Sequence, residues 1–149
     1  MKFITKPALL LIGLILVLFA CSKEVERKET EKTLIDTYLR SNPTTIDTLG
    51  IYYKLTTTGT EPLLISDSVK IIYKGTVLNS NTVFVVSDSL YFIYGSNQLI
   101  LGWEKYLTFA KYTDSGILII PFQLAYGSKP MGSIPPYATL LFEFSITKP

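Results

Sequence analysis

From Gly50 onward the chain alternates apolar and polar residues with a period of two, the spacing at which a β-strand presents one face. Along residues 69–77 the apolar members of this pattern share one face: Val69, Ile71, Tyr73 and Val77. Lys70 and Lys74 fall on the other face. The alternation predicts antiparallel strands that bury one face and expose the other.

The same pattern locates the other elements of the domain. Further strands are expected at residues 51–55, 82–86, 90–94, 116–121 and 138–147. Residues 99–110 have apolar residues at helical spacing instead, with Leu99, Trp103 and Leu107 on one stripe. We therefore predict an α+β domain in which a curved antiparallel sheet of about five strands wraps over one short helix.

The chain contains no histidine and a single cysteine, Cys21. This excludes Ser-His-Asp and Cys-His catalytic arrangements, zinc sites built from His and Cys, and internal disulfides. Glycine-rich phosphate loops and EF-hand patterns are also absent from the sequence, so neither a metal nor a cofactor is expected. The acids Glu104, Asp114 and Glu143 stand alone and are expected to be solvated or to cap turns.

The N-terminal segment, residues 1–20, is expected to be an export signal. Two lysines precede an apolar run at residues 8–20. At about 1.5 Å per residue the run would cover about 20 Å of a hydrocarbon core of about 30 Å, which favours a signal over a membrane span. The cysteine after Ala20 resembles the lipid-attachment site of bacterial lipoproteins, which would make Cys21 lipidated. An uncleaved anchor, or an ordinary signal with an incidental cysteine, is the alternative.

Residues 21–45 would then carry the attachment cysteine and a charged tether. Residues 22–32 are almost wholly polar, and we expect them to be helical only in their second half. An amphipathic helix follows and should end at Asn42-Pro43. Without residues 1–20 the 14 basic residues fall to 12, equal to the 12 acids, so the sequence has no electrostatic signature of nucleic-acid binding. The globular domain is expected at residues 46–149.

Four short blocks, in order and at compatible spacing, resemble FKBP-type peptidyl-prolyl cis-trans isomerases. They are Tyr73-x-Gly75 with Phe84, then Gly95 with Leu99-Ile100-x-Gly102-Trp103-Glu104, then Ala125-Tyr126-Gly127, and finally Ile134-Pro135-Pro136-x-Ala138-Thr139-Leu140-x-Phe142. The charged leader and helix before the domain also resemble the membrane-anchored lipoprotein branch of that family, including its gliding-motility type. The resemblance implies an FKBP-like fold and isomerisation of Xaa-Pro bonds in exported proteins.

The resemblance also implies a set of site residues. The catalytic residues would be Tyr73, Phe84, Trp103, Tyr126 and Phe142. The substrate-binding residues would be Val85, Leu90, Leu99, Ile100 and Ile134. In this assignment Trp103 forms the floor under a proline ring, the Ile100 N–H binds a substrate carbonyl, and the Tyr126 hydroxyl donates another hydrogen bond.

Elementary chemistry agrees with this activity. Rotation about an Xaa-Pro bond is slow because the twisted bond loses amide resonance, and the reaction needs neither a nucleophile nor a proton donor. A histidine-free chain can therefore catalyse it with an apolar cavity that favours the twisted amide. The expected partners are proline-containing polypeptides and, through the lipid anchor, a membrane of the bacterial cell envelope, at the periplasmic face or the cell surface. The protein is expected to be a monomer.

Two alternatives remain open. Val85 stands where the family usually carries an acid, which favours a module that binds proline-containing segments, or acts as a chaperone, without catalysing isomerisation. A purely structural lipoprotein with a filled pocket is the other.

Overall fold

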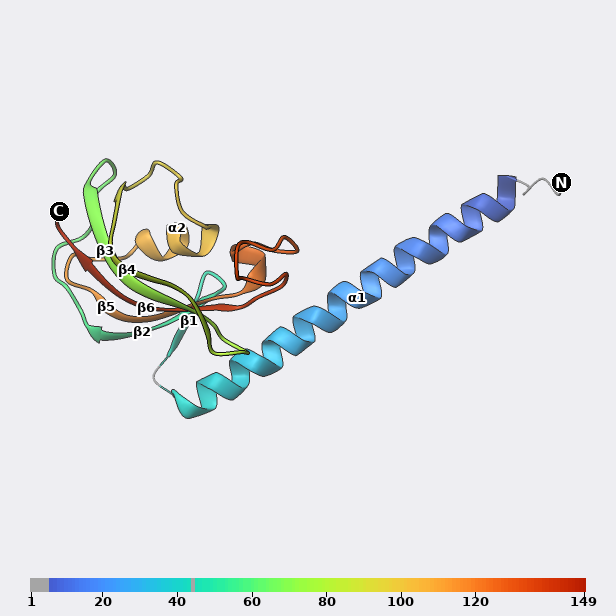
Figure 1. Cartoon of the computed structure of the whole chain (residues 1–149), viewed down its shortest axis with the longest axis horizontal. Coiled ribbons are helices and arrows are strands. Elements are labelled where there is room, and N and C mark those ends of the chain that lie inside the picture. Colours follow the sequence, from blue (N-terminus) through green and yellow to red (C-terminus); the bar gives the residue numbers. More distant parts are fainter. Residues whose placement is uncertain (1–5, 44) are drawn as a thin grey trace. The chain divides into compact units, whose positions relative to one another are not determined.

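A computed structural model describes residues 6–43 and 45–149. The chain divides into two compact units at the junction between Arg40 and Ser41. The first unit is formed by helix α1 (Lys6–Ser41) (Figure 1). Residues 1–5 of the expected signal, and the side chain of Cys21, lie outside the described part. Among the described residues, no helix has an apolar stretch long enough to cross a bilayer.

Helix α1 runs without a break through the segment that was expected to be only half helical. The segment 22–41 contains neither glycine nor proline and is rich in glutamate and lysine, which are good helix formers. Lys28 and Glu24, one turn apart, form a 3.7 Å ion pair that supports the helix weakly. The helix ends at Ser41, just before Asn42-Pro43, as predicted.

The second unit is an antiparallel sheet that curves around a short helix (Figure 1). Its six strands, in the order β1-β2-β5-β6-β3-β4, are β1 (Ile46–Thr48), β2 (Ile51–Thr57), β3 (Ser68–Val77), β4 (Thr82–Ile93), β5 (Ser115–Ile120) and β6 (Leu140–Thr147). The α+β prediction is confirmed, with two differences in the strands. The three-residue β1 is too short to show a period, and the two strands expected between residues 82 and 94 are one continuous strand.

Helix α2 (Leu101–Leu107) is shorter than the helix expected over 99–110. Ile100 has an extended backbone and caps the helix, whereas the apolar stripe continues beyond both helix ends because the flanking residues also pack inward. Gly102 allows a close approach to β5: a Cβ atom there would lie 2.3 Å from Ile120 Cγ2. This contact places Trp103 directly over the inner face of the sheet.

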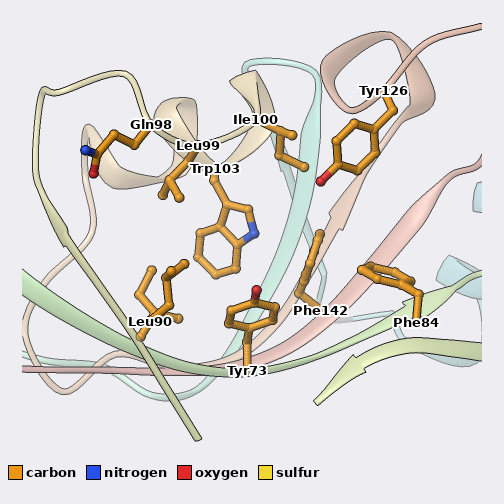
Figure 2. A pocket seen from close by; sticks show the side chains of 10 residues that line it. Tyr73, Phe84, Leu90, Gln98, Leu99, Ile100, Trp103, Tyr126 and Phe142 are labelled. Atoms are coloured by element: carbon orange, nitrogen blue, oxygen red, sulfur yellow. The ribbon is translucent and has the colours of Figure 1, made fainter. Parts of the chain in front are cut away.

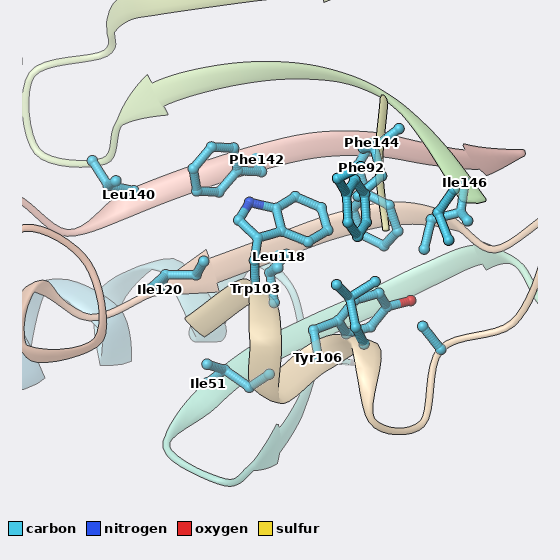
Figure 3. Packing of buried hydrophobic residues seen from close by; sticks show 14 of the residues in the cluster. Ile51, Phe92, Trp103, Tyr106, Leu118, Ile120, Leu140, Phe142, Phe144 and Ile146 are labelled. Carbon is cyan, nitrogen blue, oxygen red and sulfur yellow. The ribbon is translucent and has the colours of Figure 1, made fainter. Parts of the chain in front are cut away.

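The core lies between α2 and the inner face of the sheet (Figure 3). Leu118, Phe142 and Ile146 contribute from the central strands, and each is almost fully buried. Trp103 and Tyr106 pack edge-on against Phe144, with ring centroids 5.3 and 5.0 Å apart. The alternation in the sequence therefore identified the inner face correctly for the strands that cover the helix.

Asp114 departs from the expectation for an isolated acid, because only 2% of its surface is exposed. Its carboxylate accepts hydrogen bonds from the N–H groups of Gly59 and Lys111, at 2.7 and 2.8 Å, and from the Tyr106 hydroxyl at 3.2 Å. Burial and the neighbouring carboxylate raise the pKa of Tyr106, so the phenol remains a neutral donor. Asp114 thus ties α2 to the two loops beside it, in addition to capping a turn.

Candidate active site

A cavity of about 130 Å³ opens between α2 and the strands β3, β4 and β6 (Figure 2). Ten uncharged residues line it: Ile71, Tyr73, Phe84, Leu90, Gln98, Leu99, Ile100, Trp103, Tyr126 and Phe142. They come from five separate parts of the second unit: β3, β4, the start of α2 with the segment that enters it, the loop after the 3-10 helix, and β6. The cavity is therefore largely aromatic and aliphatic, with a few polar groups at fixed positions.

Trp103 belongs both to the core and to the cavity. Its ring lies 5.4 Å from Phe142 and 6.0 Å from Tyr106, in edge-to-face geometry at both contacts. Only 5% of the residue is exposed, yet the indole is the side chain around which the other lining residues are arranged (Figure 2). These contacts hold the ring in one orientation beneath the cavity.

A bulge in β4 places the Phe84 ring in the cavity lining. Gly75 pairs with Val85 and the next residue of β3 pairs with Val83, which leaves Phe84 without a partner in β3. The Phe84 ring lies over Gly75, where a Cβ atom would come within 2.4 Å of it. The ring then meets Phe142 edge-on at 5.8 Å. Glycine at position 75 is therefore needed for Phe84 to reach the cavity.

Tyr126 is held by the loop after the short 3-10 helix Phe122–Leu124. Gly127, at a φ of 61°, donates its N–H to the Phe122 carbonyl at 2.9 Å and accepts from the Tyr137 N–H at 2.8 Å. The Tyr126 hydroxyl points toward the indole (Figure 2) and makes no hydrogen bond to any described residue. The phenol is thus a positioned donor with no partner in the part of the chain described.

The start of α2 supplies a second polar group. The Ile100 carbonyl accepts the N–H groups of Trp103 and Glu104, at 2.9 and 3.2 Å. The Glu104 carboxylate accepts the Leu99 N–H at 3.1 Å. The N–H of Ile100 itself, between these bonds, has no acceptor among the described residues. It is available for an acceptor in the cavity.

Tyr73, on β3, is the remaining aromatic residue that lines the cavity. Its ring packs edge-on against Phe142, at a centroid distance of 5.8 Å. Burial, and to a smaller extent the nearby Tyr126, raise the pKa of Tyr73, so the phenol is neutral at physiological pH. The described lining therefore carries no ionised side chain.

The structure brings together most of the predicted site residues. All five predicted catalytic residues line the cavity, as do three of the predicted substrate-binding residues, Leu90, Leu99 and Ile100. Their roles in catalysis stay predictions. Ile71 and Gln98 were missed. Ile71 could have been found, because it lies two residues before Tyr73 on the same strand face, whereas Gln98 lies in a loop and had no signal.

Two predicted residues do not line the cavity. Ile134 is 4% exposed and exchanges backbone hydrogen bonds of 2.9 and 3.0 Å with Met131, so it is buried where it closes its own loop. Val85 is half-buried, with its side chain over Gly75 rather than in the cavity. In both cases the bulge or turn that directs the side chain cannot be read from apolar periodicity.

Comparison with known proteins adds an independent finding. A family model described as FKBP-type peptidyl-prolyl cis-trans isomerase matches residues 59–147. FK506-binding protein 1A of Neurospora crassa is 36% identical over 103 residues, which are 66% of this chain and 85% of that protein. FK506-binding protein 5 of Dictyostelium discoideum is 33% identical over 95 residues, but these are 59% of this chain and 6% of that protein.

A solved structure is similar over most of its length. The peptidyl-prolyl cis-trans isomerase of Pseudomonas syringae superimposes with a TM-score of 0.69 at 25% identity, covering 82% of this chain and 92% of that one. The chain spans 60% or less of several curated relatives, including FK506-binding protein 2 of Aspergillus oryzae at 60%.

Proposed function

Because this chain belongs to the FKBP-type peptidyl-prolyl cis-trans isomerase family, we propose that it catalyses the cis-trans isomerisation of Xaa-Pro bonds in exported proteins. The observation that carries the proposal is the uncharged cavity over the Trp103 indole, with two unpartnered donors in it. Its aromatic lining suits the apolar ring of proline.

The mechanism follows from the barrier to rotation. The two isomers of an Xaa-Pro bond differ by about 0.5–1 kcal/mol, but the barrier between them is about 18–20 kcal/mol. A planar amide is more dipolar than a twisted one and is better solvated by water. An apolar aromatic cavity therefore favours the twisted amide relative to water. The Ile100 N–H and the Tyr126 hydroxyl would hold the flanking carbonyls while the bond turns.

A direct assay distinguishes this function from the alternative, a module that binds proline-containing segments without isomerising them. The full chain in a mild detergent should accelerate the isomerisation of a short Xaa-Pro peptide, and Val85→Asp is measured beside it. Catalysis by the wild type supports the enzyme. Activity that appears only in Val85→Asp favours a module that binds proline segments without isomerising them, since this residue stands in place of an acid. Fluorescence of Trp103, the sole tryptophan, reports whether the peptide enters at all.

We further propose that the protein is a monomer anchored to a bacterial envelope membrane through lipid on Cys21. The support is a single cysteine placed directly after an apolar signal-like run. Several acyl chains on one residue would give stable anchoring, whereas one chain alone binds only marginally. Cells expressing the wild type should incorporate labelled palmitate into the protein, and Cys21→Ser should abolish the label. Equal labelling of the two proteins would refute the assignment.

A further inference from the structure

Strand β4 forms one end of the sheet, and its outer edge pairs with no strand in the described part of the chain. Every second residue of an antiparallel strand directs its backbone N–H and C=O groups away from the neighbouring strand. The described hydrogen bonds of β4 outside the ladder with β3 involve only its two ends, Thr82 and Ile93. Between these ends, the outward backbone groups are available to another chain.

The composition of β4 leaves this edge unprotected. Natural proteins usually protect an edge strand with lysine, proline or a very short length. The 12 residues of β4 include neither lysine nor proline, and Asp88 is their only charged residue. Val86 and Tyr91 expose 75% and 56% of their surface, and Ile93 exposes 45%. Two bulges interrupt the ladder with β3 and leave Leu90–Ile93 as its longest regular stretch.

The opposite end of the sheet is different. Its last strand, β1, has only three residues, one of which is Asp47. A short strand with a charged residue is a poor template for another chain. The two edges are therefore not equivalent, and β4 is the one that an extended polypeptide can lengthen by one strand.

The same strand forms part of the cavity wall, which identifies the occupant of its edge. Phe84 and Leu90 of β4 line the cavity, and Figure 2 shows them on either side of Tyr73. Because successive residues of a strand point to opposite faces, Leu90 faces the cavity and Tyr91 the outer face. A polypeptide that is bound in the cavity and continues past Leu90 therefore reaches the unpaired edge. Its side chains would lie alternately beside the cavity and next to Tyr91 and Ile93.

We propose that the outer edge of β4 is a docking site for the residues that flank the Xaa-Pro bond, which bind there in an extended conformation as an added strand. The inference rests on the proposed isomerase function and narrows its substrate class to unfolded polypeptides with apolar residues at alternate positions, several residues away from the proline. Backbone pairing with β4 supplies affinity for any sequence, and contacts with Val86 and Tyr91 select apolar side chains.

The neighbours of Val86 and Tyr91 in the ladder allow a selective variant. Lys74 of β3 lies opposite Val86. Lys70 lies opposite Tyr91, with its Nζ atom 5.5 Å from the centre of the ring. A glutamate at either position would face a lysine, which is a favourable cross-strand pair. The double variant Val86→Glu/Tyr91→Glu should therefore stay folded while it places two carboxylates on the edge that is proposed to bind apolar side chains.

Two peptides with the same Xaa-Pro bond test the docking site by catalysis. In the first, about six residues on each side alternate valine with serine, and in the second glycine replaces every valine. We expect the wild-type kcat/KM to be about tenfold higher for the valine peptide, mainly through a lower KM. The double variant should lose this preference. The control Ile46→Glu, which changes an isoleucine of similar exposure on β1, should keep it.

These kinetics separate the inference from the isomerase function. A wild type that is equally active on both peptides would overturn the docking site and leave the isomerase function intact. A preference that persists in the double variant, shown to be folded by circular dichroism, would also overturn the docking site. A wild type that is inactive on both peptides would refute the isomerase function, and hydrogen exchange would then decide on docking.

Hydrogen exchange tests docking without catalysis. Adding the valine peptide to the full chain in a mild detergent should slow the exchange of the outward amides of β4 by at least about tenfold, with no change in β1. Unchanged exchange in β4 would overturn the inference. Slow exchange that requires only a higher protein concentration, without peptide, would show that a second copy of the chain covers the edge, and the inference would be wrong.

Discussion

Trp103→Leu is expected to lower kcat/KM for an Xaa-Pro peptide by more than about tenfold, a loss of at least about 1.4 kcal/mol of transition-state stabilisation. The indole is the part of the cavity on which the proline ring would rest, and leucine has neither its flat face nor its area. The same change removes edge-on contacts with Phe142 and Phe144, so we also expect the free energy of unfolding to fall by about 2–3 kcal/mol. Isomerisation kinetics and urea unfolding measure the two effects.

A core substitution away from the cavity separates the loss of the site from the loss of stability. Ile146 is fully buried on β6 and does not line the cavity. Ile146→Ala should be destabilised by a similar amount, about 2–5 kcal/mol, but should keep its activity at a temperature where circular dichroism shows it folded. If both variants lost activity equally while folded, Trp103 would act only through stability and the cavity would not be the site.

Asp114→Ala is expected to cost about 3–5 kcal/mol of folding free energy, a large part of the stability of a domain of this size. The carboxylate is 2% exposed, and without it the N–H groups of Gly59 and Lys111 and the Tyr106 hydroxyl lose their acceptor together. Because each buried donor left unpaired carries its own desolvation penalty, the effect exceeds that of one hydrogen bond. Urea or thermal unfolding of the full chain checks it.

Two milder variants form a graded series with Asp114→Ala. Tyr106→Phe removes only the 3.2 Å bond from the phenol and should cost about 1 kcal/mol. Asp114→Asn keeps one acceptor oxygen and turns an amide donor toward the other donors, so it should fall between the two. An Asp114→Ala protein as stable as the wild type would show that the loops reach solvent and that the carboxylate does not tie them to α2.

The alternation of apolar and polar residues was enough to predict most of the strands and the inner faces of β3 and β6. Alternation identified β3 and β6, including the residues that form the core, because each residue's face depends only on its position along its own strand. The same pattern missed β1, which has only three residues. It also predicted β4 as two separate strands, because bulges interrupt the alternation along it. A shift of one residue changes the face of every later side chain, so periodicity loses its meaning beyond a bulge.

In the candidate site, too, the sequence predicted some features and tertiary packing decided the others. The absence of histidine from the sequence excluded catalytic mechanisms that need an imidazole. The four family motifs predicted most of the residues that line the cavity, including Tyr73, Trp103 and Tyr126. Tertiary packing determined the rest: Val85 packs against Gly75 instead of lining the cavity, Gln98 lines the cavity, and the lone acid Asp114 is buried where two loops meet a helix. Such contacts join different elements of the fold, as the bond between Gly59 and Asp114 joins residues 55 apart in the chain. No property of either segment alone specifies its partner, so these contacts exist only once the chain has folded.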